Sequence, residues 1–178
     1  MGERDLTAES IERSVHDALE AIGARYELIA CDPALADTAA FCAHYGVDPS
    51  KSANAILVAS RKEPKKYALC LVLATTKLDV NKKVAELLGI KKLSFASGDE
   101  TVAVTGMMIG GVTPFAIPPE VPIYVDSRIV QLDEVVVGGG SRSSKLRIAP
   151  EVFKRMPGVE IIERLALARE ASQNTEQS

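Results

Sequence analysis

The sequence predicts one α/β domain in which helices wrap a mixed, largely antiparallel sheet. Helical and strand-like patterns alternate along its 178 residues, and no internal repeat or linker divides them, which favours a single domain with a mixed sheet. Two nearly continuous apolar runs, 54–60 and 67–74, are typical of strands that are buried on both faces. Only six residues join these strands. Because a parallel pair needs a crossover of about a dozen residues or more, the two strands are predicted to form an antiparallel hairpin.

Capping residues and glycine stops predict three helices in the first half of the chain. Thr7 is placed to cap the first helix, and Leu6 is placed to pack onto Ile11 one turn later. Asp37 and Asp79 are placed to cap the second and third helices, and a glycine ends each of the three. The elements predicted up to residue 89 are a helix from Thr7 to Gly23, a strand at 26–30, a helix from Asp37 to Gly46, the hairpin, and a helix from Asp79 to Gly89.

The second half begins with a strand and a capped helix and then becomes irregular. Residues 92–96 form a predicted strand, and Ser97 with Glu100 forms a capping box for a fourth helix. The segment 106–119 contains three glycines and three prolines and breaks the helical pattern. Further predicted elements are strands at 122–126, 134–137 and 146–148, a helix from Pro150 to Met156, and a strand at 159–162. The domain is predicted to cover residues 1–165, followed by a polar tail at 166–178 whose last residues, 171–178, are predicted to be disordered.

Composition limits the kinds of function. The net charge of −3 gives no sign of a strongly basic nucleic-acid-binding domain, so any RNA contact has to be local. No stretch approaches the roughly 20 apolar residues of a membrane helix and the charged N-terminus is not a secretory signal, so a cytoplasmic protein without a membrane partner is predicted. The three cysteines form neither a disulfide nor a zinc pattern, and the two histidines have no catalytic partner at motif spacing. We therefore predict no metal, no cofactor and no nucleophilic side chain.

A glycine-rich segment at 107–115 is the most informative candidate site. The paired Gly110 and Gly111 allow backbone N–H groups to converge on an anion or a carbonyl oxygen. Thr113 adds a hydroxyl group, and Pro114 stiffens the exit from the turn. Such a turn can polarise an ester carbonyl in the manner of an oxyanion hole. The alternative is an ordinary tight loop, because glycine pairs mark turns by default.

A second glycine turn is followed by hydroxyl groups and cations. These residues can hold a phosphate or a ribose, although the spacing is not that of a nucleotide-binding P-loop and a strand follows. The alternative is a solvated turn with a basic flank. Asp126 ends an apolar strand, where its carboxylate either faces a cleft or caps a turn. We expect the two glycine turns to face one another across a crevice, and the residues of the second are Gly138, Gly139, Gly140, Ser141, Arg142 and Lys145.

Five segments occur in an order that is more specific than any one of them. They are Ala55–Ala59, Leu78–Val84, Gly110–Pro114, Tyr124–Asp126 and Gly138–Arg142. Their order resembles the YbaK family, which is related to the editing domain inserted in bacterial prolyl-tRNA synthetases. The resemblance runs from about Thr38 to Ile162, which is most of the chain.

The resemblance implies a hydrolase that acts in trans on mischarged aminoacyl-tRNA. It implies a cleft in which the ester between the wrong amino acid and the 3′ end of tRNA is cleaved without a metal or a covalent intermediate. Asn54, Gly110, Gly111 and Thr113 then position the ester for attack by water. The implied partners are tRNA and, as a candidate, an aminoacyl-tRNA synthetase, and we expect the chain to be a monomer or a weak dimer. The residues expected to bind the substrate are Lys51, Val112, Pro114, Asp126, Gly138, Gly139, Gly140, Ser141, Arg142 and Lys145.

One position departs from the family pattern. The family's characteristic lysine opens the strand at 54–60, and Asn54 stands there instead. Asn54 can still hydrogen-bond a carbonyl or a ribose hydroxyl, but it carries no charge to hold a phosphate. The charge can come from Lys51, or from Lys145 and Arg147, which stand where the family has an acidic residue. The alternatives are a binding module without catalysis and a small-molecule hydrolase that does not act on tRNA.

Overall fold

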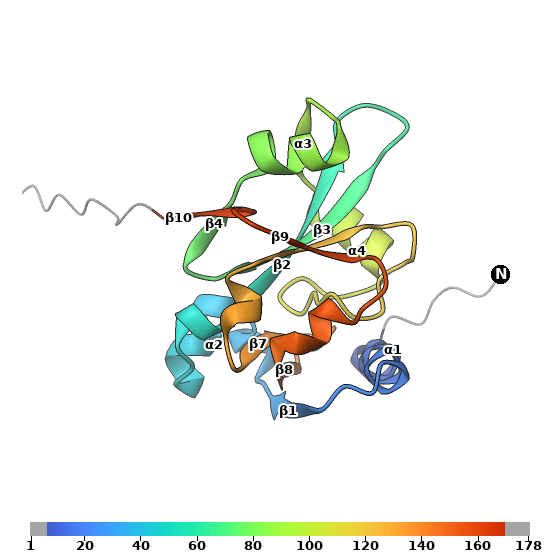
Figure 1. Ribbon diagram of the computed structural model, residues 1–178. Coiled ribbons are helices and arrows are strands. Elements are labelled where there is room, and N and C mark those ends of the chain that lie inside the picture. The colour runs from blue at the N-terminus through green and yellow to red at the C-terminus, as the bar shows by residue number, and fades with distance from the viewer. Residues whose placement is uncertain (1–6, 170–178) are drawn as a thin grey trace, which may run out of the picture.

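The computed structural model describes residues 7–169, and Figure 1 shows their arrangement. The helices are α1 (Ala8–Ala21), α2 (Thr38–Tyr45), α3 (Ala85–Leu88) and α4 (Gly98–Thr105). Short helical turns are η1 (Pro33–Leu35), η2 (Pro49–Lys51), the π-helical η3 (Val80–Val84), η4 (Ile129–Gln131) and η5 (Pro150–Lys154). The strands are β1 (Tyr26–Ala30), β2 (Ala53–Ser60), β3 (Tyr67–Leu73), β4 (Thr76–Leu78), β5 (Leu93–Phe95), β6 (Ile123–Asp126), β7 (Val135–Gly138), β8 (Ser144–Ile148), β9 (Val159–Ile162) and β10 (Ala166–Ala168). No helix in the described range is long and apolar enough to span a bilayer.

The strands form three sheets, and most of their pairs are antiparallel. The central sheet has the order β5-β2-β3-β6-β9, with β2 antiparallel to both neighbours and β6 parallel to β3 and β9. The second sheet, β1-β8-β7, and the pair β10-β4 are entirely antiparallel. The predicted hairpin and the predicted mixed, largely antiparallel α/β class are therefore confirmed. The strands are divided among three sheets rather than gathered in one. The edge strands of the central sheet are β5 and β9, and the β1-β8-β7 sheet is separate from it.

Strand β3 shows why its sequence is an almost unbroken apolar run. Successive side chains of a strand point to opposite faces of the sheet. Leu69 and Leu71 lie in the larger core, which includes side chains of α1, β7 and β8, whereas Cys70 and Val72 lie in the smaller core with side chains of η3. All four side chains are buried. On the other side of β2, β5 pairs only with residues 58–60, so the first half of β2 is left for the candidate site.

The structure confirms most of the predicted helix caps. The Thr7 hydroxyl accepts a hydrogen bond from a backbone N–H of the first turn at 3.1 Å, and the predicted capping box of α4 is complete. The packing predicted for Leu6 lies outside the described residues. Asp37 occupies the cap position of α2, but its side chain makes no capping hydrogen bond. The predicted cap residue is therefore confirmed, but the side-chain bond expected of it is absent, because the carboxylate binds Arg142 instead.

Further differences concern short elements. The third predicted helix begins as the π-helical turn η3 before it becomes α3, and the helix predicted from Pro150 is a 3-10 helix that ends at Lys154. The strands β4 and β10 are absent from the prediction, because three residues each are too few to show a period and they pair only with each other. Strand β10 extends regular structure beyond the predicted domain boundary at residue 165. Residues 170–178 of the predicted tail lie outside the described range.

Candidate functional site

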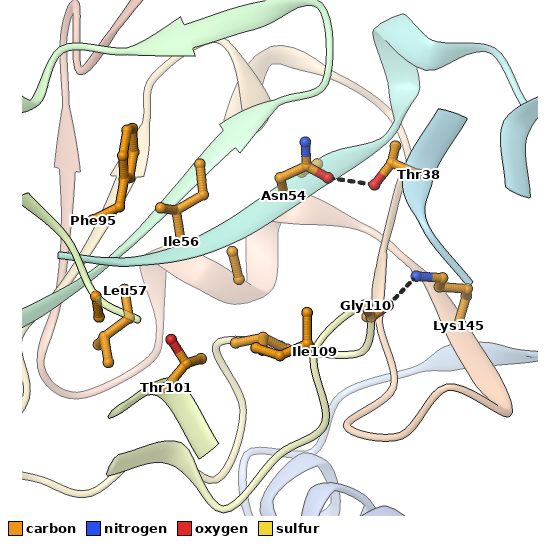
Figure 2. A pocket seen from close by; sticks show the side chains of 14 residues that line it. Thr38, Asn54, Ile56, Leu57, Phe95, Thr101, Ile109, Gly110 and Lys145 are labelled. Carbon is orange, nitrogen blue, oxygen red and sulfur yellow. Dashed lines mark hydrogen bonds between the residues drawn. The ribbon is translucent and has the colours of Figure 1, made fainter. Parts of the chain in front are cut away.

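A cavity of about 290 Å³ lies between the first half of β2 and the segment 109–112, and Figure 2 shows it from close by. One end of the cavity is lined by polar groups and the other mainly by apolar side chains. The polar end is formed by Thr38 of α2, Asn54 of β2, Gly110 and Lys145 of β8. The other end is formed by Ile56, Leu57, Phe95, Thr101 and Ile109. Ala53, Ala55, Ala96, Val112 and Gly138 complete the wall.

Asn54 presents hydrogen-bond donors to the polar end. It is half-buried on β2, opposite Val72 of β3. The Thr38 hydroxyl donates to Oδ1 of Asn54 at 2.5 Å. In this arrangement the oxygen side of the amide faces Thr38. The Nδ2 group is left with two N–H donors, which suit a carbonyl, hydroxyl or phosphate oxygen.

Lys145 places an ammonium group beside the first glycine turn. The residue is only 6% exposed, and its Nζ donates to the Gly110 carbonyl at 2.6 Å. Nζ also lies 5.6 Å from the centroid of the Phe41 ring, which is a cation–π contact. Burial lowers the pKa of Lys145 below its ordinary value, and the nearby Cys31 opposes this shift. Because an ammonium has three N–H donors, the group keeps donors for a ligand.

The first glycine turn lines the cavity with backbone. The Gly111 N–H donates to the Met108 carbonyl at 2.9 Å, which closes a turn through Ile109 and Gly110. Gly110 has a φ of +88°, a conformation that glycine adopts readily. A Cβ on Gly111 would lie 2.1 Å from the backbone oxygen of Ser141. Only glycine allows the two chain segments to approach so closely.

The second glycine turn packs directly against the first. The Gly140 N–H donates to the Gly111 carbonyl at 2.7 Å, and the Met108 N–H donates to the Gly140 carbonyl at 3.0 Å. A Cβ on Gly138 would lie 2.4 Å from the Val112 carbonyl oxygen. The two turns are thus neighbours, as expected, but the prediction of a crevice between them is wrong because backbone contacts fill that space. The cavity lies beside the pair, between the turns and β2.

Helix α1 supports the second turn from behind. A Cβ on Gly140 would lie 2.8 Å from Ile11, so the turn approaches the helix as closely as glycine permits. Oε1 of Glu12 accepts hydrogen bonds from the hydroxyls of Ser141 at 2.5 Å and Ser144 at 3.0 Å. Both serines are buried, Ser141 completely. Glu12 carries no signal of this role in the sequence, because 129 residues separate it from Ser141.

Arg142 joins the first turn to the start of α2. Its Nη1 donates to Asp37 at 3.1 Å and to the Ile109 carbonyl at 2.9 Å. Its Nε donates to the Pro33 carbonyl at 2.9 Å. The guanidinium therefore binds three acceptors of the protein itself, and it holds the edge of the site together.

Nine of the predicted site residues do not line the cavity, and Thr113, Pro114, Lys51 and Asp126 are four of them. Thr113 and Pro114 are buried, and the Thr113 hydroxyl has no hydrogen-bond partner among the described residues. Lys51 is exposed and lines a separate cavity. Asp126 is 1% exposed, and its carboxylate accepts from two backbone N–H groups at 2.9 Å, one of which belongs to β10. Asp126 thus caps a turn and anchors β10, which is the alternative that its strand-end position left open.

The structure brings five of the predicted residues to the cavity and adds others. The five are Asn54, Gly110, Val112, Gly138 and Lys145, and behind them lie Gly111, Gly139, Gly140, Ser141 and Arg142. The lining residues that the sequence analysis missed include Thr38, Phe95 and Thr101. Each of these belongs to an ordinary helix or strand pattern, so only the tertiary arrangement reveals it. Ile56, which also lines the cavity, is the lining residue that the sequence could have indicated. It follows Asn54 by two residues in β2, so the two side chains lie on the same face of the strand.

None of the three thiols lines the cavity. Cys31, Cys42 and Cys70 are free and buried. Burial raises the pKa of Cys70 to about 12, so this thiol stays protonated at neutral pH. Within residues 7–169, no three side chains of His, Cys, Asp or Glu are grouped so that they could hold a metal ion.

The fold and the cavity define a class of protein, a small α/β domain in which a strand and paired backbone turns enclose one polar-ended pocket. The chain belongs to the aminoacyl-tRNA editing domain family, which it matches over residues 32–156. All of the residues that line the cavity fall inside this range, whereas α1 with Glu12 precedes it.

Two curated proteins are similar in sequence over part of the chain. A protein of Enterococcus faecalis, EbsC, whose name proposes a Cys-tRNA(Pro)/Cys-tRNA(Cys) deacylase, is 29% identical over 72 residues, 40% of this chain and 44% of that protein. The Bacillus subtilis protein YwhH, named as uncharacterised, is 30% identical over 106 residues, 60% of this chain and 65% of that protein. The chain thus spans less than two thirds of the length of either relative.

Two solved structures share the fold. The crystal structure of a protein described as a proposed trans-editing enzyme for prolyl-tRNA synthetase matches with a TM-score of 0.72 and 24% identity, covering 85% of this chain and 94% of that chain. The crystal structure of a hypothetical protein matches with a TM-score of 0.74 and 25% identity, covering 84% of this chain and 97% of that chain. The α/β architecture described above is therefore that of both structures.

Proposed function

We propose that this chain hydrolyses mischarged aminoacyl-tRNA in trans by cleaving the ester between the amino acid and the 3′ end of the tRNA. The observation that carries the proposal is the two-ended chemistry of the cavity in a member of the aminoacyl-tRNA editing domain family. Ligand pockets span about 300–1,000 Å³, so this cavity is among the smallest. A cavity of this size accepts an amino acid and part of a ribose, and the rest of the tRNA lies outside.

The two ends of the cavity suit the two parts of an aminoacyl ester. The polar end offers Nδ2 of Asn54 and Nζ of Lys145 as donors, and the ester carbonyl and ribose hydroxyls are acceptors. The other end, near Leu57 and Phe95, suits an uncharged side chain. The amino acid therefore lies along β2. Discrimination rests on its size, which is worth about 1–3 kcal/mol per methylene in a pocket of this kind.

The reaction is attack of water on the ester carbonyl. A bond forms between the water oxygen and the carbonyl carbon, the bond from that carbon to the ribose oxygen breaks, and the ribose oxygen takes up the proton that water loses. The products are a free amino acid and a tRNA with a free terminal hydroxyl. Asn54 and Lys145 supply donors for the charge that develops on the carbonyl oxygen. A neighbouring hydroxyl of the substrate's ribose assists the proton transfer, so the task of the protein is to position the ester.

Lys145 is the cation that we assign to the ester. Asn54 stands where the family that the sequence resembles has its lysine, but the Lys145 ammonium reaches the same cavity from β8. A charge in a buried site acts on a polarised oxygen more strongly than one in water. The other two cations considered for this charge, Lys51 and Arg147, both line a separate cavity, and Arg147 is also paired with Glu27. Arg142 is placed less well too, because it binds protein acceptors.

The same proposal includes the setting of the reaction. We propose tRNA as the substrate, the cytoplasm as the compartment and an aminoacyl-tRNA synthetase as a candidate partner. Membership of the aminoacyl-tRNA editing domain family supports tRNA as the substrate directly. It supports the compartment and the synthetase partner less directly, because editing is part of translation.

A panel of mischarged tRNAs tests the proposal. The full chain should release the amino acid from at least one member of the panel, and Asn54→Ala should lower kcat/KM by about 10- to 100-fold through the loss of a donor to the ester. Asn54→Lys restores the cation of the family pattern and should keep the activity. Lys51→Met is the control, because Lys51 lies outside the cavity, and it should leave kcat/KM unchanged.

The alternative function, binding without catalysis, is suggested by a single departure in the sequence, the neutral Asn54 at the family's lysine position. Saturable binding of tRNA with no turnover of any mischarged member would establish this binding module and end the enzymatic proposal. Turnover of small aminoacyl esters with no preference for tRNA would instead point to a small-molecule hydrolase.

A further inference from the structure

The cavity holds only the end of a tRNA, so the rest of that molecule has to lie on the surface outside. We infer that the acceptor-strand phosphates bind the basic end of the chain, which consists of the β2–β3 loop at 61–66 and the segment 82–92. This inference rests on the proposed function and adds to it the surface that holds the body of the substrate.

The basic end concentrates positive charge in a chain that is negative overall. Its two segments hold eight of the 21 Lys and Arg residues but only two, Glu63 and Glu86, of the 24 Asp and Glu residues. The net charge of the whole chain is −3, so the remaining sequence is acidic. A local basic surface on such a protein steers a polyanion to one place.

The two segments meet in space although they are distant in sequence. The Arg61 N–H donates to the Lys92 carbonyl at 3.1 Å, and β5, which follows Lys92, pairs with the end of β2. Strand β5 also contacts η3, where the second segment begins. Figure 1 shows the β2–β3 loop and α3 at one end of the molecule, opposite α1 and the β1-β8-β7 sheet.

The cations of the basic end are available to a ligand. Arg61, Lys62, Lys66, Lys91 and Lys92 are exposed, and none of them forms an ion pair within residues 7–169. The cations beside the cavity differ, because they already donate to acceptors of the protein. The phosphates of a bound tRNA therefore find their free counter-charges at the basic end rather than beside the glycine turns.

A path leads from the cavity to the basic end. Phe95 lines the cavity, and it is 57% exposed. Lys92 precedes it by three residues, so at about 3.3 Å per residue of extended chain the two Cα atoms lie about 10 Å apart. An exposed aromatic ring and exposed cations on neighbouring parts of one surface can together bind single-stranded nucleic acid, because bases stack on the ring while phosphates meet the cations. The unpaired 3′ strand of an aminoacyl-tRNA fits this path.

Binding of uncharged tRNA to the full chain tests the inference independently of catalysis. The variant Lys62→Gln/Lys91→Gln/Lys92→Gln should raise Kd at least about tenfold and lower the log–log salt dependence of binding by about two, because about three phosphate contacts are lost. The control removes the same charge from exposed positions on α1, β4 and η5, and it should change Kd little: Arg13→Gln/Lys77→Gln/Lys154→Gln.

Hydrolysis of a short ester, aminoacyl-adenosine, separates failure of this inference from failure of the proposed function. Both triple variants should cleave it as the wild type does, because it does not reach the basic end. Equal tRNA affinities of the two variants would overturn the inference, and so would loss of ester hydrolysis in the basic-end variant alone. If the affinities differ as expected but the wild type cleaves neither ester nor tRNA, the RNA-binding surface is supported and the proposed function is overturned.

Discussion

The turn at Gly110 and Gly111 forms part of the cavity wall, whereas most of the turn at 138–140 lies behind it. In the first turn, the backbone of Gly110 faces the space that a ligand would fill. In the second turn, an added Cβ on Gly139 would lie 2.3 Å from the Ser144 hydroxyl oxygen. An added Cβ on Gly140 would lie 2.8 Å from the Ile11 side chain. Both turns need glycine because other parts of the protein approach closely: in the first turn, an added Cβ would lie 2.2 Å from Arg142 at Gly110 and 2.1 Å from the Ser141 backbone at Gly111. The turns differ because the first also borders the cavity.

This difference assigns separate roles to two similar sequences. The first turn contributes directly to the site, and the second holds the first in place through the hydrogen bond from Gly140 to Gly111. The second turn is held in its own place by Glu12 of α1. Helix α1, which lies outside the family match, therefore stabilises the second turn, and the second turn stabilises the first.

Alanine at Gly111 is expected to have the largest effect, because it breaks the contact between the turns. The added Cβ would lie 2.1 Å from the backbone oxygen of Ser141, which cannot move without its turn. We expect the free energy of unfolding to fall by about 3 kcal/mol or more, measured by urea denaturation. Gly23→Ala is the control, because Gly23 has a φ of +64° but nothing within 4 Å of the added Cβ. It should cost only about 1 kcal/mol, and equal losses would show that the turns are not tightly packed.

Lys145→Met is expected to have the next largest effect, on catalysis rather than on folding. Removing a donor from the developing oxyanion should lower kcat/KM for mischarged tRNA by about 100-fold. Lys51→Met removes the same group from an exposed position outside the cavity and should have no effect. A loss of activity in Lys51→Met with full activity in Lys145→Met would contradict this assignment and show that Lys51, not Lys145, supplies the cation.

Glu12→Ala is expected to weaken the support of the second turn. The two serine hydroxyls that donate to Glu12 are buried, so they would lose their acceptor without gaining water. The free energy of unfolding should fall by about 2 kcal/mol, because a hydrogen bond to a charged group is worth about 1.5–3 kcal/mol. Glu9→Ala is the matched control on the same helix, since its side chain is 87% exposed and forms an exposed ion pair with Arg13. A similar, small change in both variants would contradict the role of α1.

The smallest expected effect is a shift in the pH dependence of activity. Burial lowers the pKa of Lys145, so the ammonium loses its proton at a lower pH than an ordinary lysine, whose pKa is about 10.4. After subtraction of uncatalysed hydrolysis, kcat/KM should therefore decline as the pH rises through this lowered pKa. Lys145→Arg keeps its charge over this range, so whatever activity it retains should not decline. The same alkaline decline in both proteins would assign it to another group.

Most of the fold is predictable from the sequence because its signals are local. The apolar runs of β2 and β3, the short loop between them, and the capping box of α4 each specify an element within a few residues. The exceptions are short or cooperative. β4 and β10 pair only with each other among the described strands. Asp37 keeps the cap position of α2, but its carboxylate binds Arg142, far along the chain, instead of the helix backbone.

The candidate site is less predictable, because its geometry depends on distant contacts. Glycine content marks both turns, but it does not say whether a ligand or another segment approaches them. The sequence likewise gives Lys145 as a cation near the second turn, whereas its burial and its bond to Gly110 depend on how β8 packs. Phe95 carries no signal of its own, because an aromatic residue in a strand is usually part of a core.

The most direct test of the cavity as the aminoacyl site is to fill it. Ala55 lies on β2 in the wall of the cavity, and Ala103 lies on α4 in the wall of a different cavity. Deacylation of mischarged tRNA and of aminoacyl-adenosine should be compared for Ala55→Leu and Ala103→Leu, with the melting temperature of each measured alongside. We predict that Ala55→Leu alone loses both activities while its melting temperature and its affinity for uncharged tRNA are retained. Undiminished deacylation of both substrates by folded Ala55→Leu would contradict the assignment of this cavity.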